Sequence, residues 1–487
     1  MNYDFDKWKL NFEILFKQSL IFGNLRILFS YIFIFFLIGI LNVVHALPSF
    51  ARQTGQSCVA CHAGGQFPEL TPYGRIFKLT GYTIGTQGNP FSAMVLADVT
   101  QNKKNIDSFS GGIIAPQNNI PIIDAASVFI AGKVTDNIGG FVQITYSVYD
   151  HQDGSGNWRG HVGSDNTDLR YTNRSITNND DLILGINVNN NPGVQDVWNS
   201  SPTWSYPYVG APSAATSFPG MPFATKLEDA TLAQQVAGIG GYAYWNKSIY
   251  IELTGYQTAT GFWKSLSQGY KPADPYNPLV YSQGVSPYVR AAYTRQWDDQ
   301  NIMVGLIALS TNIYKLDTIT NLPQYGSVTH YQDKGVDAQY QYLLDPHTVT
   351  AHFRYIKENI NDDTGIYGHK NNLDSIYAKV AYIFRNQYGA NIGYRRVNGS
   401  SDAQAYQNYT SAAISNPAVT SYSTSLNNSP ETKLWTPEAF WLPQQNLHVG
   451  LQYNIFTEYL GAKSNYDGNK RNASDNNYAY LYAWLVF

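Results

Sequence analysis

Regular alternation of apolar and polar residues is the feature that most constrains the fold of this chain. In the stretch NLHVGLQYNIF every second residue from Leu447 to Ile455 is apolar, and the residues between them are polar or small. The same period of two recurs in TVTAHFRY, GVDAQYQYLL and SIYAKVAYIFR, while no sustained helical period follows Phe91. Successive side chains of a β-strand point to opposite faces, so the pattern predicts an all-β body.

The lengths of the connections distinguish between two all-β architectures. A soluble sandwich turns its apolar face inward, whereas a transmembrane barrel turns its apolar face to lipid. Short connections are predicted at 135–140, 246–247, 298–300, 345–346, 386–387 and 443–445, and long polar loops at 150–166, 191–235, 259–287, 311–333, 359–373, 399–430 and 457–476. Short and long connections alternate, as they do when one rim of an outer-membrane barrel carries tight periplasmic turns and the other carries extended outer loops. We therefore expect an antiparallel transmembrane β-barrel of about 16 strands.

Composition agrees with a barrel in the outer membrane of a Gram-negative bacterium. Charged residues make up 14% of the chain, against about 25% in soluble domains, so we expect much of the surface to face lipid. The 38 tyrosines suit aromatic girdles at the two membrane interfaces, and the alternating stretch NNYAYLYAWLVF ends on an aromatic residue, Phe487. Two segments, DLRYTNR and TKLWTPEAFWL, fit the strand pattern least well. The net charge of −3 argues against nucleic acid as a partner.

The first 46 residues have the layout of a secretory signal peptide. A basic flank leads into the apolar run of RILFSYIFIFFLIGILNVVHA, which closes on small residues. Cleavage is expected after Ala46. The alternative is an uncleaved membrane anchor, since the run is just long enough to span a bilayer.

The only two cysteines of the chain lie in GQSCVACHAGG, where His62 directly follows the second. The spacing Cys58-x-x-Cys61-His62 is typical of c-type haem attachment, in which two thiols bond the macrocycle and the next imidazole binds iron. A thioredoxin-like redox pair would need a βαβ pattern nearby, and a zinc site would need further close Cys or His ligands. Neither is visible, so we predict one covalent haem c.

The rest of the chain is predicted to have two parts. Residues 47–90, which hold the haem motif, should form a small cytochrome c-like segment, and residues 91–487 should form the porin-like barrel. A segment of this size is near the lower limit for burying its own core, so we expect it to plug the periplasmic mouth of the barrel. A loosely tethered segment is the alternative. Arg75 in this segment is a candidate partner for a haem propionate.

Met94 is the candidate for the sixth ligand of the haem iron. In FSAMVLADVTQ it shares a face with Asp98 and Thr100, which should point into the lumen near the mouth where the haem segment arrives. Ordinary packing against the plug is the alternative role. His352 and His448 are lumenal by the same alternation and are predicted mainly to line the pore.

The sequence resembles a known family over two stretches, Ala51–Gly85 (ARQTGQSCVACHAGGQFPELTPYGRIFKLTGYTIG) and Leu182–Tyr208 (LILGINVNNNPGVQDVWNSSPTWSYPY). It is similar to the fused monohaem cytochrome c–porins of outer membranes, whose best-known members oxidise Fe(II). The resemblance implies haem attachment at Cys58 and Cys61 with His62 as the proximal ligand. It also implies an Fe(II):cytochrome c oxidoreductase with an extracellular donor and a periplasmic cytochrome or copper protein as acceptor.

Two other functions stay open at this point. A donor other than iron can supply the electrons of the same architecture. A porin whose haem plug is structural or sensory, with solute passage as its task, has the same sequence pattern.

Overall fold

The computed structural model describes residues 48–487 except 66–68, 107–110, 116, 153–157, 201–205, 217–220, 229–231, 269–278, 318, 364–369 and 408–424. The predicted signal peptide therefore lies outside the described residues. The helices are α3 (Ser49–Thr54), α4 (Cys58–Cys61), α5 (Pro72–Leu79) and α6 (Ala403–Gln407), with 3₁₀ turns η1 (Ala63–Gly65), η3 (Gly261–Leu266) and η4 (Ala473–Asn476). None of the helices in these ranges is long and apolar enough to cross a bilayer.

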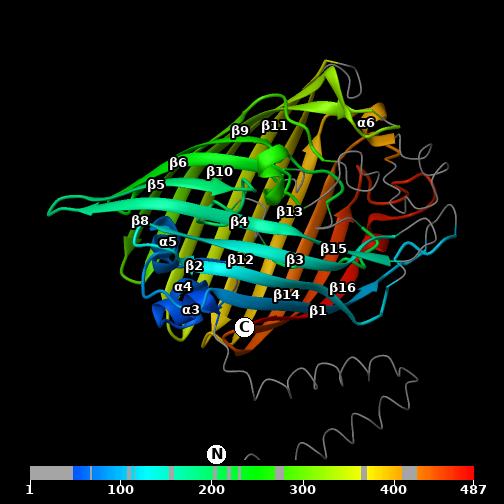
Figure 1. Ribbon diagram of the computed structural model, residues 1–487. Coiled ribbons are helices and arrows are strands. Elements are labelled where there is room, and N and C mark those ends of the chain that lie inside the picture. The colour runs from blue at the N-terminus through cyan, green and yellow to red at the C-terminus, as the bar shows by residue number, and fades with distance from the viewer. Residues whose placement is uncertain are drawn as a thin grey trace, which may run out of the picture.

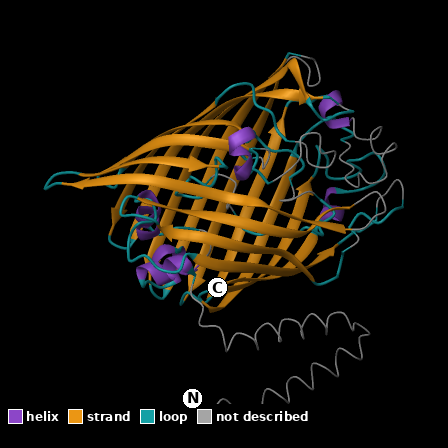
Figure 2. Cartoon of the chain, in the orientation of Figure 1, coloured by secondary structure: helices purple, strands orange, loops and turns teal. Residues whose placement is uncertain are grey.

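Sixteen strands make up most of the described chain (Figure 2). They are β1 (Phe91–Asn102), β2 (Ile122–Lys133), β3 (Ile138–Gln152), β4 (Trp158–Ile176), β5 (Asp181–Asn189), β6 (Val236–Trp245), β7 (Ile249–Thr258), β8 (Ser286–Trp297), β9 (Gln300–Leu316), β10 (Pro323–Leu344), β11 (His347–Asp362), β12 (Asn371–Phe384), β13 (Tyr388–Gly399), β14 (Thr432–Gln444), β15 (Leu447–Glu458) and β16 (Tyr478–Val486). Each pairs antiparallel with its neighbours in sequence.

The first and last strands pair with each other and close the sheet. Their register runs from Met94 opposite Val486 to Asn102 opposite Tyr478, and the strand order forms a closed barrel. Closure leaves no exposed sheet edge. The predicted antiparallel barrel of 16 strands is confirmed, including the two strands with the weakest pattern, β4 and β14.

The polarity of the barrel is inverted relative to a soluble sandwich. On β15, Leu451 and Tyr453 face outward with 52% and 45% of their surface exposed. Gln452 and Asn454, which alternate with them, face inward and are buried. On β11 the fully buried Arg354 follows the exposed Phe353. Apolar side chains outside and polar side chains inside are the arrangement of a barrel embedded in lipid.

Two predicted long loops are wrong because the strands continue through them. β3 runs to Gln152 and β4 begins at Trp158, so most of the predicted loop 150–166 is strand, with Ser147 paired to His161. β9 and β10 likewise leave only 317–322 of the predicted loop 311–333. Where a strand extends beyond the bilayer neither face meets lipid, so hydrogen bonding continues after the apolar alternation has ended.

The N-terminal segment packs into the end of the barrel that carries the short turns (Figure 1). The Cys58 amide donates to Oε1 of Gln445, in the turn between β14 and β15, at 3.0 Å. The Lys133 amide at the end of β2 donates to Oε1 of Gln53 at 2.8 Å. The segment is therefore fixed to the rim of the mouth at two places, and α6 lies at the opposite end of the barrel.

The connection between β5 and β6 crosses the lumen, contrary to the prediction of an outer loop at 191–235. Trp198 packs against Tyr250 of β7 with ring centroids 5.2 Å apart. Further along, the Tyr206 hydroxyl donates to the carbonyl of Thr436 on β14 at 2.9 Å, and Asn102 of β1 donates to the carbonyl of Ser213 at 2.7 Å. Polar composition alone does not separate a loop that faces water outside from one that meets a polar lumen.

Candidate functional site

The two cysteines and the histidine lie on one short turn of helix. α4 runs from Cys58 to Cys61, and the His62 amide donates to the Cys58 carbonyl at 2.8 Å. Side chains three positions apart lie on the same helix face, so both thiols are presented together. Cys58 and Cys61 are free thiols, the first buried and the second half-buried.

The following helix holds this turn in place. The Thr71 hydroxyl accepts from the Gly74 amide at 3.1 Å and donates to the Ala60 carbonyl at 2.6 Å, so one side chain caps α5 and ties it to α4. A Cβ at Gly74 would lie 2.2 Å from the Cys61 carbonyl oxygen, which leaves no room for a side chain there. The Thr-Pro start of α5 is a common helix-start signal, yet its link to the cysteine turn was not apparent from sequence.

Burial sets the protonation of the three side chains. It raises the pKa of the Cys61 thiol to about 11 and raises that of Cys58. It lowers the pKa of His62 to about 4, so the imidazole is neutral near pH 7. Neutral imidazole is the form that binds metal. Two free thiols and a neutral imidazole on one turn are a donor set that fits a c-type haem.

Glu69 anchors the segment to the inner wall of the barrel. Its carboxylate is fully buried and accepts from Lys379 Nζ of β12 at 2.6 Å and from the Tyr208 hydroxyl at 2.9 Å. Its other oxygen is 3.0 Å from Nε2 of His352 on β11. The charges and hydrogen bonds of Lys379 and His352 outweigh desolvation and hold the pKa of Glu69 well below its usual range. No pattern in the sequence marked Glu69, because both of its ion-pair partners are distant in the chain.

Arg75 is buried among neutral oxygen acceptors. Its guanidinium donates to Gln339 at 2.8 Å, to Asn301 at 2.8 Å and to the Leu70 carbonyl at 3.0 Å. Within the described residues no carboxylate lies at ion-pair distance from it, and burial lowers its pKa to about 10. A buried guanidinium without a carboxylate suits an anionic group such as a propionate.

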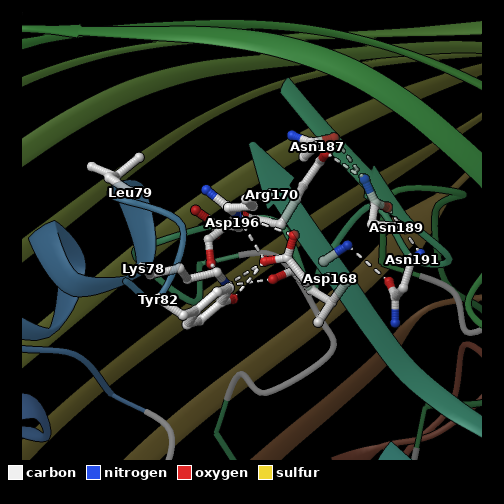
Figure 3. A network of polar contacts seen from close by, with 12 residues as sticks. Lys78, Leu79, Tyr82, Asp168, Arg170, Asn187, Asn189, Asn191 and Asp196 are labelled. Atoms are coloured by element: carbon white, nitrogen blue, oxygen red, sulfur yellow. Dashed lines mark hydrogen bonds and ion pairs between the residues drawn. The ribbon is translucent and has the colours of Figure 1, made fainter. Parts of the chain in front are cut away.

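A second network joins the end of α5 to β4 and to the crossing loop (Figure 3). The Tyr82 hydroxyl donates to Asp168 Oδ2 at 2.6 Å, and Arg170 pairs with the same carboxylate at 3.0 Å. Lys78 Nζ donates to the carbonyls of Val194 and Asp196. Burial lowers the pKa of Lys78 to about 8. The segment is therefore held by the wall and the crossing loop together.

Met94 lies on the inner face of β1, as the alternation predicts. It is half-buried and packs against an inner cluster that includes Leu96, Tyr482 and Trp484. The cysteine turn contacts another part of the wall, since Gly64 lies against Ile383 of β12. Ligation of iron by Met94 stays a prediction.

His448 has an environment that sequence analysis did not anticipate. Tyr482 donates its hydroxyl proton to Glu438, so its oxygen accepts from His448 Nε2 at 3.0 Å. That bond places the proton on Nε2 and leaves a lone pair on Nδ1, which is buried without a hydrogen-bond partner among the described residues. Metal-binding histidines commonly donate their other ring N–H in this way. The imidazole lies 4.7 Å from the ring of Phe440, which packs with Leu442, and Leu442 contacts Gly65 of the cysteine loop.

Two other histidines, one predicted in the lumen and one in an outer loop, have hydrogen-bond partners in the structure. His352 is buried and committed to Glu69. His161, predicted in an outer loop, lies in β4 and contacts the Gln268 carbonyl. Among the described residues, the ring of His448 has a buried nitrogen, Nδ1, without a hydrogen-bond partner, whereas the contacts of His352 and His161 are made through Nε2.

The fold defines the class of protein: a porin-like β-barrel of the outer membrane of a Gram-negative bacterium, with a lumen occupied by an N-terminal segment and a crossing loop. A scan against protein-family models and a search of curated proteins give no match.

Solved structures of outer-membrane proteins align over 82% of the chain. They include OmpF of Salmonella typhi in complex with daunomycin (11% identity, 97% of that chain, TM-score 0.44). The channel DcaP of Acinetobacter baumannii (10%, 96%, 0.43) and OmpT of Vibrio cholerae (11%, 96%, 0.40) align similarly. At these TM-scores the likeness carries no argument about function.

Proposed function

We propose that this protein is an outer-membrane c-type cytochrome–porin fusion. It takes electrons from an extracellular donor, foremost Fe(II), through one covalent haem and passes them to a periplasmic cytochrome or copper protein. Its activity is then that of an Fe(II):cytochrome c oxidoreductase. The resemblance to fused monohaem cytochrome c–porins led to this proposal.

One observation carries the proposal: the Cys58-x-x-Cys61-His62 turn is seated inside the short-turn mouth of a closed barrel. Both thiols are presented from one helical turn, and the imidazole beside them is neutral. In this position the turn can reach the lumen on one side and the periplasm on the other.

The residues of the chain have separate roles in this proposal. Cys58 and Cys61 would hold the macrocycle, and His62 would bind the iron. Bound there, a haem supplies a one-electron acceptor between the outside and the periplasm. Glu69 fixes the depth of the segment in the mouth, and Arg75 offers its guanidinium to a propionate.

The sixth ligand has two candidates on the same side of the wall. Met94 would place a thioether on iron, which raises the haem potential and suits a donor such as Fe(II). His448 offers the lone pair of Nδ1 and already has its Nε2–H fixed by Tyr482. Nitrogen and sulfur ligation differ in the optical and magnetic spectra of haem, so spectroscopy separates them.

The first experiment tests the haem. Denaturing gels of the mature protein stained for haem peroxidase activity should show one band, and C58A and C61A should each weaken it. An unchanged stain in the double variant would refute covalent attachment. Matched gels stained for total protein control for expression.

The second experiment tests the donor. Anaerobic Fe(II) added to the purified oxidised protein should shift the haem spectrum to the reduced form within the mixing time. Mn(II) and reduced quinones test other donors in the same assay. If none reduces the haem across a range of pH while bilayers show solute conductance, the protein is a plugged porin. The segment and crossing loop that occupy the lumen favour low conductance.

A further inference from the structure

The inner face of β1 carries a buried carboxylate without a partner. Asp98 has 4% of its surface exposed, and neither of its oxygens has a hydrogen-bond partner in the described part of the chain. Thr100, the next inward residue of the strand, is fully buried, and its hydroxyl is likewise unpartnered. Nearly all buried polar groups in folded proteins are satisfied, so these two adjacent side chains need a partner, either water or a ligand.

The neighbouring strand contributes a fourth unpartnered oxygen. Tyr480 of β16 lies directly opposite Thr100 in the strand register. Its hydroxyl is fully buried without a partner among the described residues, and it is close enough to Asp98 for the carboxylate charge to act on it. Four oxygen atoms from two adjacent strands therefore lie in one region of the inner wall.

A β-bulge brings a second carboxylate to the same region. Leu96 pairs with Ala125 and Ala97 pairs with Ile123, so Asp124 is the extra residue of β2. Bulges change the direction of a side chain and are common beside functional sites. Asp98 lies opposite Ile122, two residues from Asp124 along β2, and the charge of Asp124 acts on Asp98.

The crossing loop covers this region from the lumen side. Asn102, the last residue of β1, donates to the carbonyl of Ser213 at 2.7 Å and accepts from the amide of Ala215 at 2.8 Å. Val209 and Ala211 of the loop belong to the same buried cluster as Leu96 and Tyr480. Asp98 is buried and Asp124 is half-buried, so the two carboxylates repel each other and an uncompensated charge on Asp98 is costly.

The chemistry of these oxygen atoms indicates which class of ligand the site would bind. Carboxylates and hydroxyls suit hard divalent cations, and two negative charges balance one such ion. No basic side chain forms an ion pair with Asp98 or Asp124 in the described ranges. No group of three or more His, Cys, Asp or Glu gathers there either, so water would complete the coordination.

We propose that Asp98 and Asp124, with the hydroxyls of Thr100 and Tyr480, bind one divalent cation of the oxygen-preferring class on the inner wall of the barrel. The site is separate from the cysteine turn and needs no haem. It is a resting place for such a cation inside the lumen, between the outer rim and the segment.

Manganese binding to the whole purified protein in detergent tests the site without any electron transfer. Titration with Mn(II), followed by the loss of the free-ion electron paramagnetic resonance signal, should give one bound ion per chain. D98N should weaken binding at least tenfold, and D124N and T100V should weaken it less. D317N, which changes an exposed outer-loop carboxylate bonded to Thr320, should bind like the native protein. Anaerobic Fe(II), Mg(II) or Ca(II) should compete.

Three results would overturn the proposal. The first is the absence of Mn(II) binding at millimolar concentration, together with an infrared band of a protonated carboxyl that disappears in D98N. That combination would mean that the two aspartates share a proton and bind no cation. The second is equal binding by native protein and D98N. The third is equal loss in D317N. Heat-modifiable migration on gels verifies that each variant forms a barrel, and failure of Fe(II) to reduce the haem leaves the Mn(II) result unaffected.

Discussion

Replacing Glu69 by Gln should detach the N-terminal segment from the barrel wall. The native carboxylate bonds Lys379, Tyr208 and His352, and all of these groups are removed from water. Breaking a buried ion pair by removing one partner costs about 3–5 kcal/mol, because the other charge stays buried. In E69Q the ammonium of Lys379 keeps the phenol oxygen of Tyr208, at 2.5 Å, but loses its carboxylate partner.

Amide hydrogen exchange in α5 measures this loss directly. A tenfold change in an equilibrium constant corresponds to 1.36 kcal/mol. The expected loss of stability should therefore make the α5 amides exchange roughly 10²- to 10⁴-fold faster. Strand amides of β7, on another part of the wall, should be unchanged. E431Q is the matched control, since Glu431 pairs with Lys433 and Arg396 in a partly exposed position at the outer rim. Such pairs contribute only about 0–1 kcal/mol.

The reasoning is wrong if E69Q and E431Q change exchange equally, or if α5 is unaffected by E69Q. Combining E69Q with K379M supplies a further check. Replacing both members of a buried pair removes the stranded charge, so the double variant should regain part of the lost protection.

Three further predictions concern pH, the sixth ligand and topology. Because the pKa of Glu69 is depressed, its stabilisation is present above the unfolded value of about 4.3 and is lost only as pH falls through the lower folded value. Exchange in α5, corrected for intrinsic rates, should therefore stay slow from pH 7 down to pH 4 in native protein and be fast over the same range in E69Q. M94A should keep the covalent haem but lose any thioether-to-iron charge-transfer band, whereas an unchanged spectrum in M94A and an altered one in H448A would assign the ligand to His448. An epitope inserted after Gly468 should be reached on intact cells and one at Asn386–Gln387 should not, and the opposite result would show that the rims are inverted.

The alternation of apolar and polar residues was sufficient to predict the barrel because lipid imposes that period on every strand. It also placed Asp98, Thr100, His352 and His448 on the inner face correctly. The strand extensions beyond the bilayer were missed, since no lipid-facing period exists there.

The other features that the sequence did not reveal depend on contacts between residues far apart in the chain or on the pairing of neighbouring strands. The bulge at Asp124 shifts the register by one residue, which alternation in a single strand cannot show. The path of the β5–β6 connection and the pairing of Glu69 with Lys379 depend on contacts between residues far apart in the chain. Cys58, Cys61 and His62 were recognisable because their spacing is local.

The enclosure of the N-terminal segment has a consequence for the order of biogenesis. The cysteine turn lies inside a ring that becomes continuous only when β1 pairs with β16. Cys58 is buried against the inner rim. An enzyme could therefore not reach its thiol once the segment is docked. Any covalent attachment to these cysteines must therefore precede the docking of the segment in the mouth. The enclosure thus imposes an order in which attachment comes first and docking second.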